Sequence, residues 1–463
     1  MTAKVHCLSR SIARLNGVRA RFPACSAVDV RSWRRRLNFA ATMVLIAGIE
    51  PVGAEVFEVT SSDDAGTGSL RAALAQANDR AGEDTIKFAT DLSAITLDSG
   101  QLEITDDLKI IGPEPRQIIS GNSNSRIFNM SAGQNLELEN LELINGKTSL
   151  ARSSVACSEN DGQGGAVCVN GADLVLRSVI IQNNETTGSF AHGGAVRGDR
   201  ITVQDSAFDT NSAVDGQGGA IYATGELVVS NTVVIGNFSG DNGGGVYVGA
   251  NDGTVNISNS IIDSNIAEGA GGGLVVASAV EIHSSTLSRN ASRGQGGALR
   301  LRDGSGVISN STISGNFVDV IFFFDGVGGA VKVVDADLDI RNSTITGNSA
   351  NNGGNGGVSV TSTSGDALTL ALDSSVLAAN TGMTGNFAST AEAGGDILLS
   401  ARFSMFGDPP EEINAVSDSN VFSDDPGLSG LQDNGCALAA GTGPFQQCVP
   451  THLPTTNSSL IGN

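Results

Sequence analysis

Two short motifs alternate along the middle of the chain, and their period limits the possible fold more than any other feature. The first is a double glycine followed by a small or aliphatic residue, as in GGAI from Gly218 and GGGV from Gly243. The second is an apolar residue, two spacers and an asparagine, repeated every 25 to 32 residues. A period of this size is typical of stacked structural repeats. The asparagines are Asn183, Asn211, Asn237, Asn265, Asn290, Asn316, Asn348 and Asn380.

The segments between these motifs indicate which repeat architecture forms. ELVVSNTVVIGN and LDIRNSTITGN contain short β-branched runs with alternating apolar residues, broken by Asn, Ser and Gly. Such runs predict strands of a few residues joined by tight turns, and they carry no helical period. Three such strands with their turns fill about 25 residues, which is one coil of a parallel β-helix whose coils lie about 4.8 Å apart. We therefore predict an all-β fold, a single-stranded parallel β-helix (solenoid).

The two motifs suit two different corners of such a coil. An asparagine tolerates left-handed backbone angles, and amides stacked at one corner can hydrogen-bond along a column. We therefore interpret the repeated asparagines as a buried structural ladder rather than as a ligand-binding row. The glycines suit a corner where a positive φ angle or the close approach of neighbouring coils excludes a Cβ atom.

The N-terminal part of the repeat region is less regular and begins with a helical signal. GSLRAALAQAN places Leu70, Ala73, Leu74 and Ala77 on one face of a short helix, with Ser69 at its start. Alternating strands follow in the range 94–146. Because the open end of a β-helix exposes unpaired strand edges and core, we predict that this helix caps it.

The first 54 residues differ in composition from the rest. They hold nine of the 27 basic residues and two of the 49 acidic ones, so the remaining chain carries a net charge of −29. A basic stretch, an apolar run over 39–49 and the small residues before Glu55 predict a secretory signal. The apolar run is too short to span a bilayer. We expect export, no transmembrane span in the mature chain, and no binding to nucleic acid, which such an acidic protein repels.

Cysteine usage agrees with an exported protein. Four cysteines remain after the leader, in two local pairs, Cys157 with Cys168 and Cys436 with Cys448. An even number in an exported chain favours disulfides. Three pairings are possible, and we expect the two short-range ones. No CxxC spacing supports zinc, the calcium-binding glycine-aspartate repeat is absent, and we expect no metal and no cofactor.

Three stretches resemble a known family. VTSSDDAGTGSLRAALAQAN is similar to the N-terminal module of exported bacterial right-handed β-helix proteins with a CSLREA-type motif. The GGA[ILV] and [FIVL]xxN pairs resemble polymorphic outer membrane protein repeats, and DPGLSGLQDNGC with PTHLPTTNSSLIGN resembles the C-terminal module of the same family. The chain departs from the motifs, since it reads GSLRAAL without the cysteine and has phenylalanine in FxxN only at Phe208. The resemblance implies a right-handed, pectin lyase-like β-helix, export, and an outer-membrane or cell-surface location.

These features divide the chain into four parts. We expect a leader at 1–54, an N-terminal cap and first coils at 55–146, the GGAI/FxxN-type repeats at 147–400, and C-terminal coils with a cap at 401–463.

One column of residues stands out from the repeats. The positions just after each double-glycine motif hold both tyrosines of the chain in consecutive places. Period-2 alternation predicts that this column faces outward, where aromatic and cationic side chains can stack on sugar rings and pair with carboxylates. Cross-strand packing on a solvated face is the alternative. The candidate ligand-binding residues are Arg197, Tyr222, Tyr247, Arg300 and Lys332.

A second candidate surface lies in NFVDVIFFFDG, an insertion into one repeat. Its residues Phe322, Phe323 and Phe324 form a partner-binding patch if they are exposed. If they fold back, they cover the flank of the β-helix instead. The sequence leaves both possibilities open.

We expect an exported, surface-associated or secreted protein without catalytic residues, acting in adhesion or interaction or as an envelope component. Its partner would be a cell-surface glycan or the surface of a host or neighbouring cell. The alternative is a lyase or hydrolase acting on acidic polysaccharides, which needs two carboxylates and a base converging on adjacent coils. The GHG and RIK signatures of polygalacturonases are absent.

Overall fold

A computed structural model describes most of the chain after residue 52. The chain divides into two units, Met1–Glu50 and Pro51–Asn463, and all described residues belong to the second. The described ranges are 53–130, 133–150, 156–158, 161–249, 253–319, 327–351, 354–391, 395–407, 420–423, 425–432 and 450–455.

Three of the sequence predictions fall outside the described residues. They concern the leader up to residue 52, the apolar insertion with Phe322, Phe323 and Phe324, and the second cysteine pair, Cys436 and Cys448. The partner-binding patch and the second disulfide therefore stay predictions.

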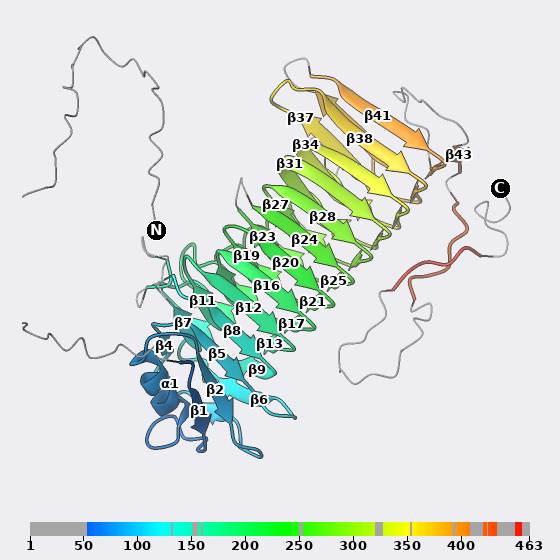
Figure 1. Cartoon of the computed structure of the whole chain (residues 1–463). Helices are drawn as coiled ribbons and strands as arrows, with labels where there is room; N and C mark the ends of the chain where they lie inside the picture. The colour runs from blue at the N-terminus through cyan, green and yellow to red at the C-terminus, as the bar shows by residue number, and fades with distance from the viewer. Residues whose placement is uncertain are drawn as a thin grey trace, which may run out of the picture. The chain divides into compact units, whose positions relative to one another are not determined.

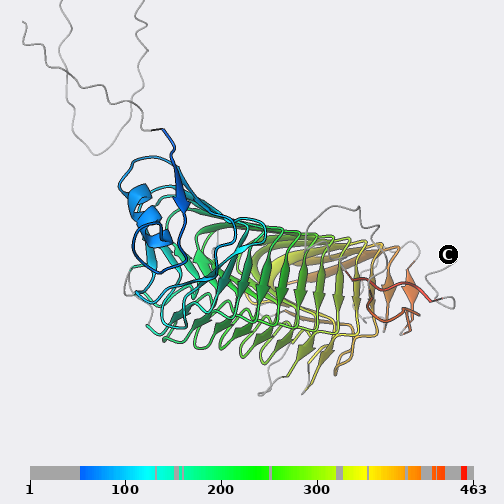
Figure 2. The same cartoon turned by 90° about the horizontal axis from the view of Figure 1, so that it is seen from below.

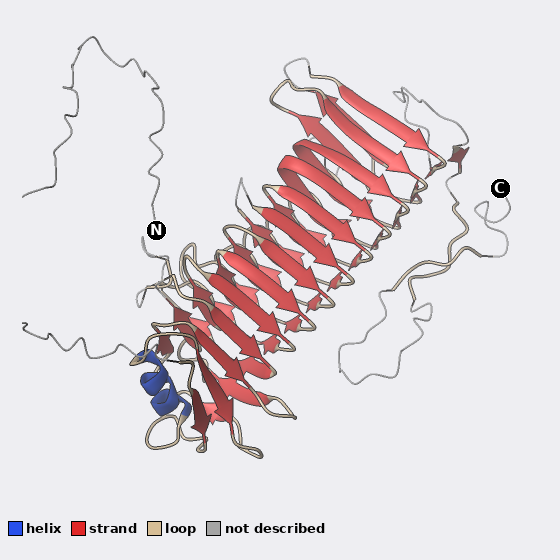
Figure 3. Cartoon of the chain, viewed as in Figure 1, coloured by secondary structure: helices blue, strands red, loops and turns tan. Residues whose placement is uncertain are grey.

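The second unit is a right-handed parallel β-helix of about 12 turns, with the architecture that the repeats predicted and the hand that the family resemblance implied. Successive coils stack through parallel strand pairs, and strands follow one another along the stack in chain order (Figure 1, Figure 3). Within the described ranges the strands form three sheets of 22, 13 and 8 strands, which we call sheets A, B and C. No helix in these ranges is long and apolar enough to cross a bilayer.

Sheet A receives two strands from most coils. The first set is β4 (Leu102–Ile104), β7 (Phe128–Met130), β11 (Val167–Val169), β15 (Val196–Gly198), β19 (Ile221–Ala223), β23 (Val246–Val248), β27 (Leu274–Val276), β37 (Val358–Ser362) and β40 (Phe387–Ala391). The second set is β1 (Val56–Val59), β2 (Asp84–Phe88), β5 (Leu108–Ile111), β8 (Leu136–Glu139), β12 (Asp173–Arg177), β16 (Arg200–Gln204), β20 (Leu227–Ser230), β24 (Thr254–Ser258), β28 (Ala279–His283), β38 (Leu368–Asp373) and β41 (Ile397–Arg402). In two coils the sets join into the single strands β31 (Leu299–Ser309) and β34 (Val331–Arg341).

Sheets B and C follow sheet A in each coil. Sheet B is β3 (Ile95–Thr96), β6 (Gln117–Ser120), β9 (Leu141–Ile144), β13 (Ile180–Gln182), β17 (Ala207–Asp209), β21 (Val233–Ile235), β25 (Ile261–Asp263), β29 (Thr286–Ser288), β32 (Thr312–Ser314), β35 (Thr344–Thr346), β39 (Val376–Ala378), β42 (Met405–Phe406) and β43 (Val421–Phe422). Sheet C is β10 (Lys147–Thr148), β14 (Glu185–Thr186), β18 (Ser212–Ala213), β22 (Phe238–Ser239), β26 (Ile266–Ala267), β30 (Ala291–Ser292), β33 (Phe317–Val318) and β36 (Ser349–Ala350). A regular coil thus has four strands, one more than the sequence predicted.

The interior of the stack is a continuous apolar core. Alternate residues of each strand point inward, as Leu174 and Leu176 of β12 and Ile181 of β13 do, and all three are completely buried. The inward residues of successive coils belong to one hydrophobic cluster that runs from Val59 to Phe406. Each coil therefore buries its apolar side chains against both neighbours, which is how a solenoid without a globular core is stabilised.

The N-terminal end is capped as the sequence predicted. Helix α1 (Leu70–Asn78) lies beside β1, β2 and β4 at the first coils (Figure 1, Figure 2). Its buried residues are the predicted ones, Leu70, Ala73, Leu74 and Ala77. Ser69 is the N-cap, and its Oγ accepts a hydrogen bond from the Ala72 N–H at 3.2 Å.

Replacing Ser69 by alanine should lower the free energy of unfolding by about 1 kcal/mol, because the buried N-cap loses the oxygen that satisfies a free helical N–H. Thermal unfolding followed by circular dichroism measures the change. Thr67→Ala, at an exposed position in the same turn, is the matched control. Equal stability of the two variants would contradict a capping role for Ser69.

A file of buried asparagines lies at the corner between sheets B and C and links each coil to the next. In each link, the backbone N–H and the Nδ2 of one asparagine both donate to the Oδ1 of the next. Asn237, for example, donates to Asn265 Oδ1 at 3.0 and 2.9 Å. Its Nδ2 also donates to the carbonyl oxygen of Phe208 on the preceding coil. The file runs through Asn184, Asn211, Asn237, Asn265, Asn290, Asn316, Asn348, Asn380 and Asn386.

The prediction of the first ladder position, Asn183, is wrong by one residue. Asn183 is exposed with a φ of 56°, whereas Asn184 is buried and donates to Asn211 Oδ1. The strand register pairs Ile181, not Ile180, with Phe208, so the motif must be counted from Ile181. The left-handed conformation belongs to the residue before each ladder asparagine, and the asparagine itself supplies the buried amide.

A second ladder, built from hydroxyls, occupies the corner between sheets A and B. The Ser260 N–H donates to Ser285 Oγ at 3.1 Å, and the Ser260 hydroxyl donates to the Ser258 carbonyl at 2.7 Å. The sequence analysis missed this ladder, although the recurring Ser or Thr of SNT, SNS and RNS is its signal. Its members are Ser206, Thr232, Ser260, Ser285, Ser311, Ser343, Ser375 and Ser404.

The two glycines of each motif are required for two different reasons. Gly218 has a φ of 70°, which a residue with a side chain rarely adopts. Gly219 has an ordinary φ, but a Cβ atom there would lie 2.0 Å from the carbonyl oxygen of Gly244 on the next coil. The first glycine therefore allows the turn, and the second allows the coils to stack at strand distance.

Candidate functional site

The predicted column lies on the first strand set of sheet A and is in register from coil to coil. Arg197, Tyr222 and Tyr247 are direct neighbours on β15, β19 and β23. Val275, Arg300 and Lys332 continue the column on β27, β31 and β34. The complete file, which we call the sheet A column, is Glu103, Asn129, Cys168, Arg197, Tyr222, Tyr247, Val275, Arg300, Lys332, Ser359 and Ala388.

The column is not a solvated stripe, and this corrects the predicted exposure of three of its residues. Arg197, Tyr222 and Lys332 are buried, with 6%, 8% and 1% of their surface exposed. The His192 ring stacks on Tyr222, Arg197 contacts Cys157 of the loop before β11, and Lys332 contacts Ser359 of the next coil. Tyr247 and Arg300 are only partly buried.

Arg197 is occupied by structural contacts. Its Nη1 donates to the Val169 carbonyl at 2.8 Å, and its Nη2 forms an ion pair with Asp199 at 3.0 Å. Nη1 also lies 3.6 Å from the sulfur of Cys157. The same is true of Lys332, whose Nζ donates to Ser359 Oγ at 3.1 Å. Both cations therefore serve to hold coils and loops together.

Cys157 and Cys168 form a disulfide, one of the two predicted short-range pairs, with the Cα atoms 5.4 Å apart. The bond ties the loop before β11 to the sheet A column. The structure does not show the other predicted disulfide, because Cys436 and Cys448 both lie outside the described residues.

The disulfide also bears on the expectation of no metal. Asp161 lies close to the sulfurs of Cys157 and Cys168, and among the described residues these three make the group that most resembles a metal site. Sulfurs bonded to each other are not thiolate ligands, so this group does not hold a metal in the oxidised protein.

A fully buried cation, missed by the sequence analysis, lies beneath the same loop. Arg126 Nε donates to the carbonyl oxygens of Gln163 and Gly164, both at 3.0 Å, and its Nη2 reaches Gln163 at 2.7 Å. Burial lowers the pKa of Arg126 to about 10, so the guanidinium remains charged at neutral pH. Its contacts join the loop to the first coils. The sequence holds no periodic signal for this residue, because it precedes the regular repeats.

Two tyrosine rings of the sheet A column stack on each other, and a histidine ring from outside the column stacks on the first of them. The His192 ring lies 4.5 Å from the Tyr222 ring, and the Tyr222 ring lies 5.4 Å from the Tyr247 ring, with interplanar angles of 15° and 5°. His192 Nδ1 accepts a hydrogen bond from the Gln217 N–H at 2.9 Å, which fixes its orientation. The sequence offered a signal for His192, because a polar residue precedes most double glycines, as in QGG, HGG and NGG.

Arg300 differs from the other cations of the column. Its Nε is buried without a hydrogen-bond partner, and no ion pair joins it to the described residues. Burial lowers the pKa of Arg300, and the charge of Arg302 adds to this, while Tyr247, Asp303 and Asp241 act in the opposite direction. We call Tyr247, Arg300 and Asp241 the Tyr247–Arg300 patch. It combines a partly exposed ring, held in place by the stack behind it, with a guanidinium that retains free donors.

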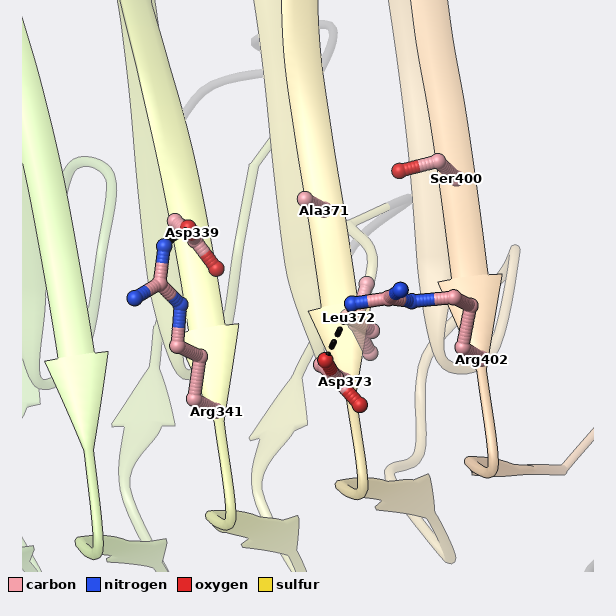
Figure 4. Close-up of a pocket in the computed structure, with 7 residues that line it drawn as sticks. All are labelled: Asp339, Arg341, Ala371, Leu372, Asp373, Ser400 and Arg402. Carbon is pink, nitrogen blue, oxygen red and sulfur yellow. Dashed lines mark hydrogen bonds and ion pairs between the residues drawn. The ribbon is translucent and has the colours of Figure 1, made fainter.

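A depression of about 380 Å³ lies on the second strand set of sheet A, between β34, β38 and β41 (Figure 4). Ala371 and Ser400 have short side chains between longer charged ones, which hollows the surface there (Figure 4). Its cations are paired, since Arg402 Nη2 lies 2.5 Å from Asp373 and Arg341 is paired with Asp339. Both arginine side chains are more than half exposed, so solvent screens these pairs. The depression is therefore a weaker candidate than the Tyr247–Arg300 patch.

Comparisons with known proteins add a likeness of fold. No protein-family model matches the chain, and no curated protein does. Its solved structural neighbours include the periplasmic alginate epimerase AlgG, at 10% identity over 74% of this chain and 76% of that chain, with a TM-score of 0.35. Tailspike protein 3 of bacteriophage CBA120 is similar at 11% identity over 78% of this chain and 59% of that chain, with a TM-score of 0.37. Both likenesses concern the course of the backbone and assign no activity.

Proposed function

We propose that the chain is an exported, surface-associated or secreted β-helix protein that binds a glycan without cleaving it. The observation that carries the proposal is that the guanidinium of Arg300, which has no partner among the described residues, lies two coils along the column from the partly exposed ring of Tyr247. Export is supported by the composition of the leader and by the disulfide between Cys157 and Cys168.

The chemistry of the patch suits a sugar. An aromatic ring packs against the apolar face of a pyranose, and the ring of Tyr247 is held rigid by Tyr222, so little side-chain entropy is lost on binding. The free N–H groups of Arg300 can donate to a sugar carboxylate or hydroxyl. Asp241, whose Oδ2 accepts from Gln217 at 2.9 Å, can accept a hydroxyl proton. Ligand-binding sites typically combine apolar or aromatic surface with a small number of precisely placed polar groups, and the patch has this composition.

Replacing Tyr247 or Arg300 by alanine in the chain from Glu55 onward should weaken glycan binding about tenfold, which corresponds to about 1.4 kcal/mol. Binding is measured on an array of acidic and neutral polysaccharides, and product release is recorded in parallel, with and without Ca²⁺. Arg177→Ala is the matched control, because it removes the same charge from another part of sheet A, where Arg177 pairs with Glu137.

Three outcomes distinguish the alternatives. Unchanged binding by Tyr247→Ala and Arg300→Ala would remove the patch from the proposal. Release of unsaturated or reducing ends would identify a lyase or hydrolase instead. An intact protein that binds no glycan on the array would contradict the proposed function and favour an envelope component or a protein partner.

A further inference from the structure

The C-terminal part of the chain returns over the outer face of sheet B. Residues 427–432 and 450–455 pair with each other in antiparallel orientation, and we call them the C-terminal strap. The strap is attached to the sheet by Thr286 of β29, whose hydroxyl donates to the carbonyl oxygen of Pro450 at 2.6 Å. A segment remote in sequence therefore brings new side chains against the outward hydroxyls of sheet B.

His452 of the strap lies between two oxygen atoms. Its Nδ1 is 2.6 Å from the carbonyl oxygen of Ser429, and its Nε2 is 2.8 Å from Ser314 Oγ on β32. Because a carbonyl oxygen only accepts hydrogen bonds, Nδ1 carries a proton. In the neutral imidazole Nε2 is then the acceptor, so the Ser314 hydroxyl donates its proton to it.

These contacts have the geometry of an activated nucleophile. The defining features are a hydroxyl within hydrogen-bond reach of a base and a third group that orients the base. In serine hydrolases a carboxylate usually orients the histidine and fixes its tautomer. Here the Ser429 carbonyl takes that place and fixes the same tautomer.

The surroundings of Ser314 leave space and include a cation that is already paired with a carboxylate. Gly347 on the following coil carries no side chain, and a Cβ there would lie 3.8 Å from Ser314 Oγ. The stem of Arg289 passes beside Gly315, the residue after Ser314, and its guanidinium is 60% exposed. Its Nη2 pairs with Asp263 at 2.7 Å, and its remaining exposed N–H groups can stabilise negative charge on a reacting carbonyl oxygen. Ser314 itself is 6% exposed, which restricts access to small groups.

We propose that Ser314 and His452 form a nucleophile–base pair that hydrolyses short-chain carboxylic esters. Ser314 Oγ attacks the ester carbonyl carbon while His452 Nε2 takes the hydroxyl proton. The proton then passes to the departing alcohol as the carbon–oxygen bond breaks, which leaves an acyl group on Ser314. Water, deprotonated by His452, attacks this acyl group and releases the carboxylic acid and the free serine. The proposal does not depend on glycan binding.

A fluorophosphonate probe and 4-nitrophenyl acetate test this pair on the chain from Glu55 onward. We expect the probe to label the protein stoichiometrically, with the adduct on Ser314 in the peptide mass spectrum. Ser314→Ala should abolish labelling, and His452→Gln should slow ester hydrolysis at least about 100-fold. Ser288→Ala is the matched control, because Ser288 neighbours Ser314 in sheet B but donates to Asp263 at 2.6 Å.

The peptide mass spectrum of the probe-treated protein without substitutions decides the proposal even if a variant fails to fold. Absence of a Ser314 adduct, or an adduct at another residue, would overturn it and would make the contact a purely structural attachment of the strap. Thermal unfolding of Ser314→Ala and His452→Gln separates a lost nucleophile from a lost fold. Glycan binding at Tyr247 and Arg300 is measured in a different assay, so either proposal can fail alone.

Discussion

Replacing Asn265 by alanine should lower the free energy of unfolding by about 3–5 kcal/mol, because several buried polar groups lose their partners at once. The Asn237 N–H and Nδ2 both lose their acceptor, Asn265 Oδ1. The carbonyl oxygen of Val234 loses the donor Asn265 Nδ2, and Asn290 Oδ1 loses one of its two donors. Water cannot replace these contacts, since Asn265 is completely buried.

Guanidinium denaturation followed by circular dichroism measures this effect. Asn256→Ala is the matched control, because Asn256 lies on the same coil but on the outer face of β24, half-buried. We expect the control to change stability by less than about 0.5 kcal/mol. Equal midpoints for the two variants would mean that the ladder does not stabilise the stack.

Gly219→Ala should destabilise the chain by about 3 kcal/mol, because overpacking against backbone atoms cannot be relieved by a side-chain rotation. The new Cβ would lie 2.0 Å from the Gly244 carbonyl oxygen and 2.5 Å from that of Phe238. Both atoms belong to the strands and turns of the stack. Two coils must therefore separate locally, which lengthens their hydrogen bonds.

A second glycine separates this steric effect from backbone strain. Gly171 has a φ of 70°, but a Cβ there would have its nearest neighbour at 3.9 Å. Gly171→Ala should therefore lose only about 1–2 kcal/mol, the penalty of a left-handed residue. Thermal midpoints of the two variants, measured at the same protein concentration, test the distinction. A larger loss in Gly171→Ala than in Gly219→Ala would contradict the assignment of coil contact to the second glycine.

The repeats predicted the coil and its two corners because strand periodicity and turn residues are local properties. They placed the first ladder residue wrongly because Asn183 and Asn184 are adjacent and only the strand register distinguishes them. They also did not predict that sheet A takes two strands from most coils. In β31 and β34 the bend lies inside one continuous strand, at Asp303 and Asp335 with φ angles of 55° and 50°, whereas Gly171 lies between β11 and β12, so no fixed residue type marks it.

The exposure of the sheet A column could not be predicted from alternation. Period-2 alternation tells which residues point away from the core, but not whether a loop lies over them. Tyr222 is covered because His192 from the preceding loop stacks on its ring, and that loop returns from sheet C. Arg300 is partly exposed, as the alternation predicted, but the sequence could not indicate that its Nε lacks a hydrogen-bond partner among the described residues.

The Ser314–His452 contact had no signal in the sequence. The two residues are 138 positions apart, and no motif relates them, because Ser314 is only a spacer of the repeat motif that ends at Asn316. Their approach depends on the return of the chain across sheet B, which is a property of tertiary packing. The likeness to a family C-terminal module drew attention to this stretch without indicating where it lies.

The amide file closes on the chain itself at its C-terminal end. Every asparagine donates in the same direction, so each coil leaves donors that only the following coil can satisfy. Asn380 is different, because its N–H and Nδ2 donate to Asn386, only six residues further along the chain. The hydroxyl ladder ends in a similar way, with the Ser404 N–H donating to Asn420 Oδ1 at 2.9 Å. A nearby amide thus ends each file of hydrogen bonds, and sheets A and B continue past the end of the amide file through β40, β41, β42 and β43.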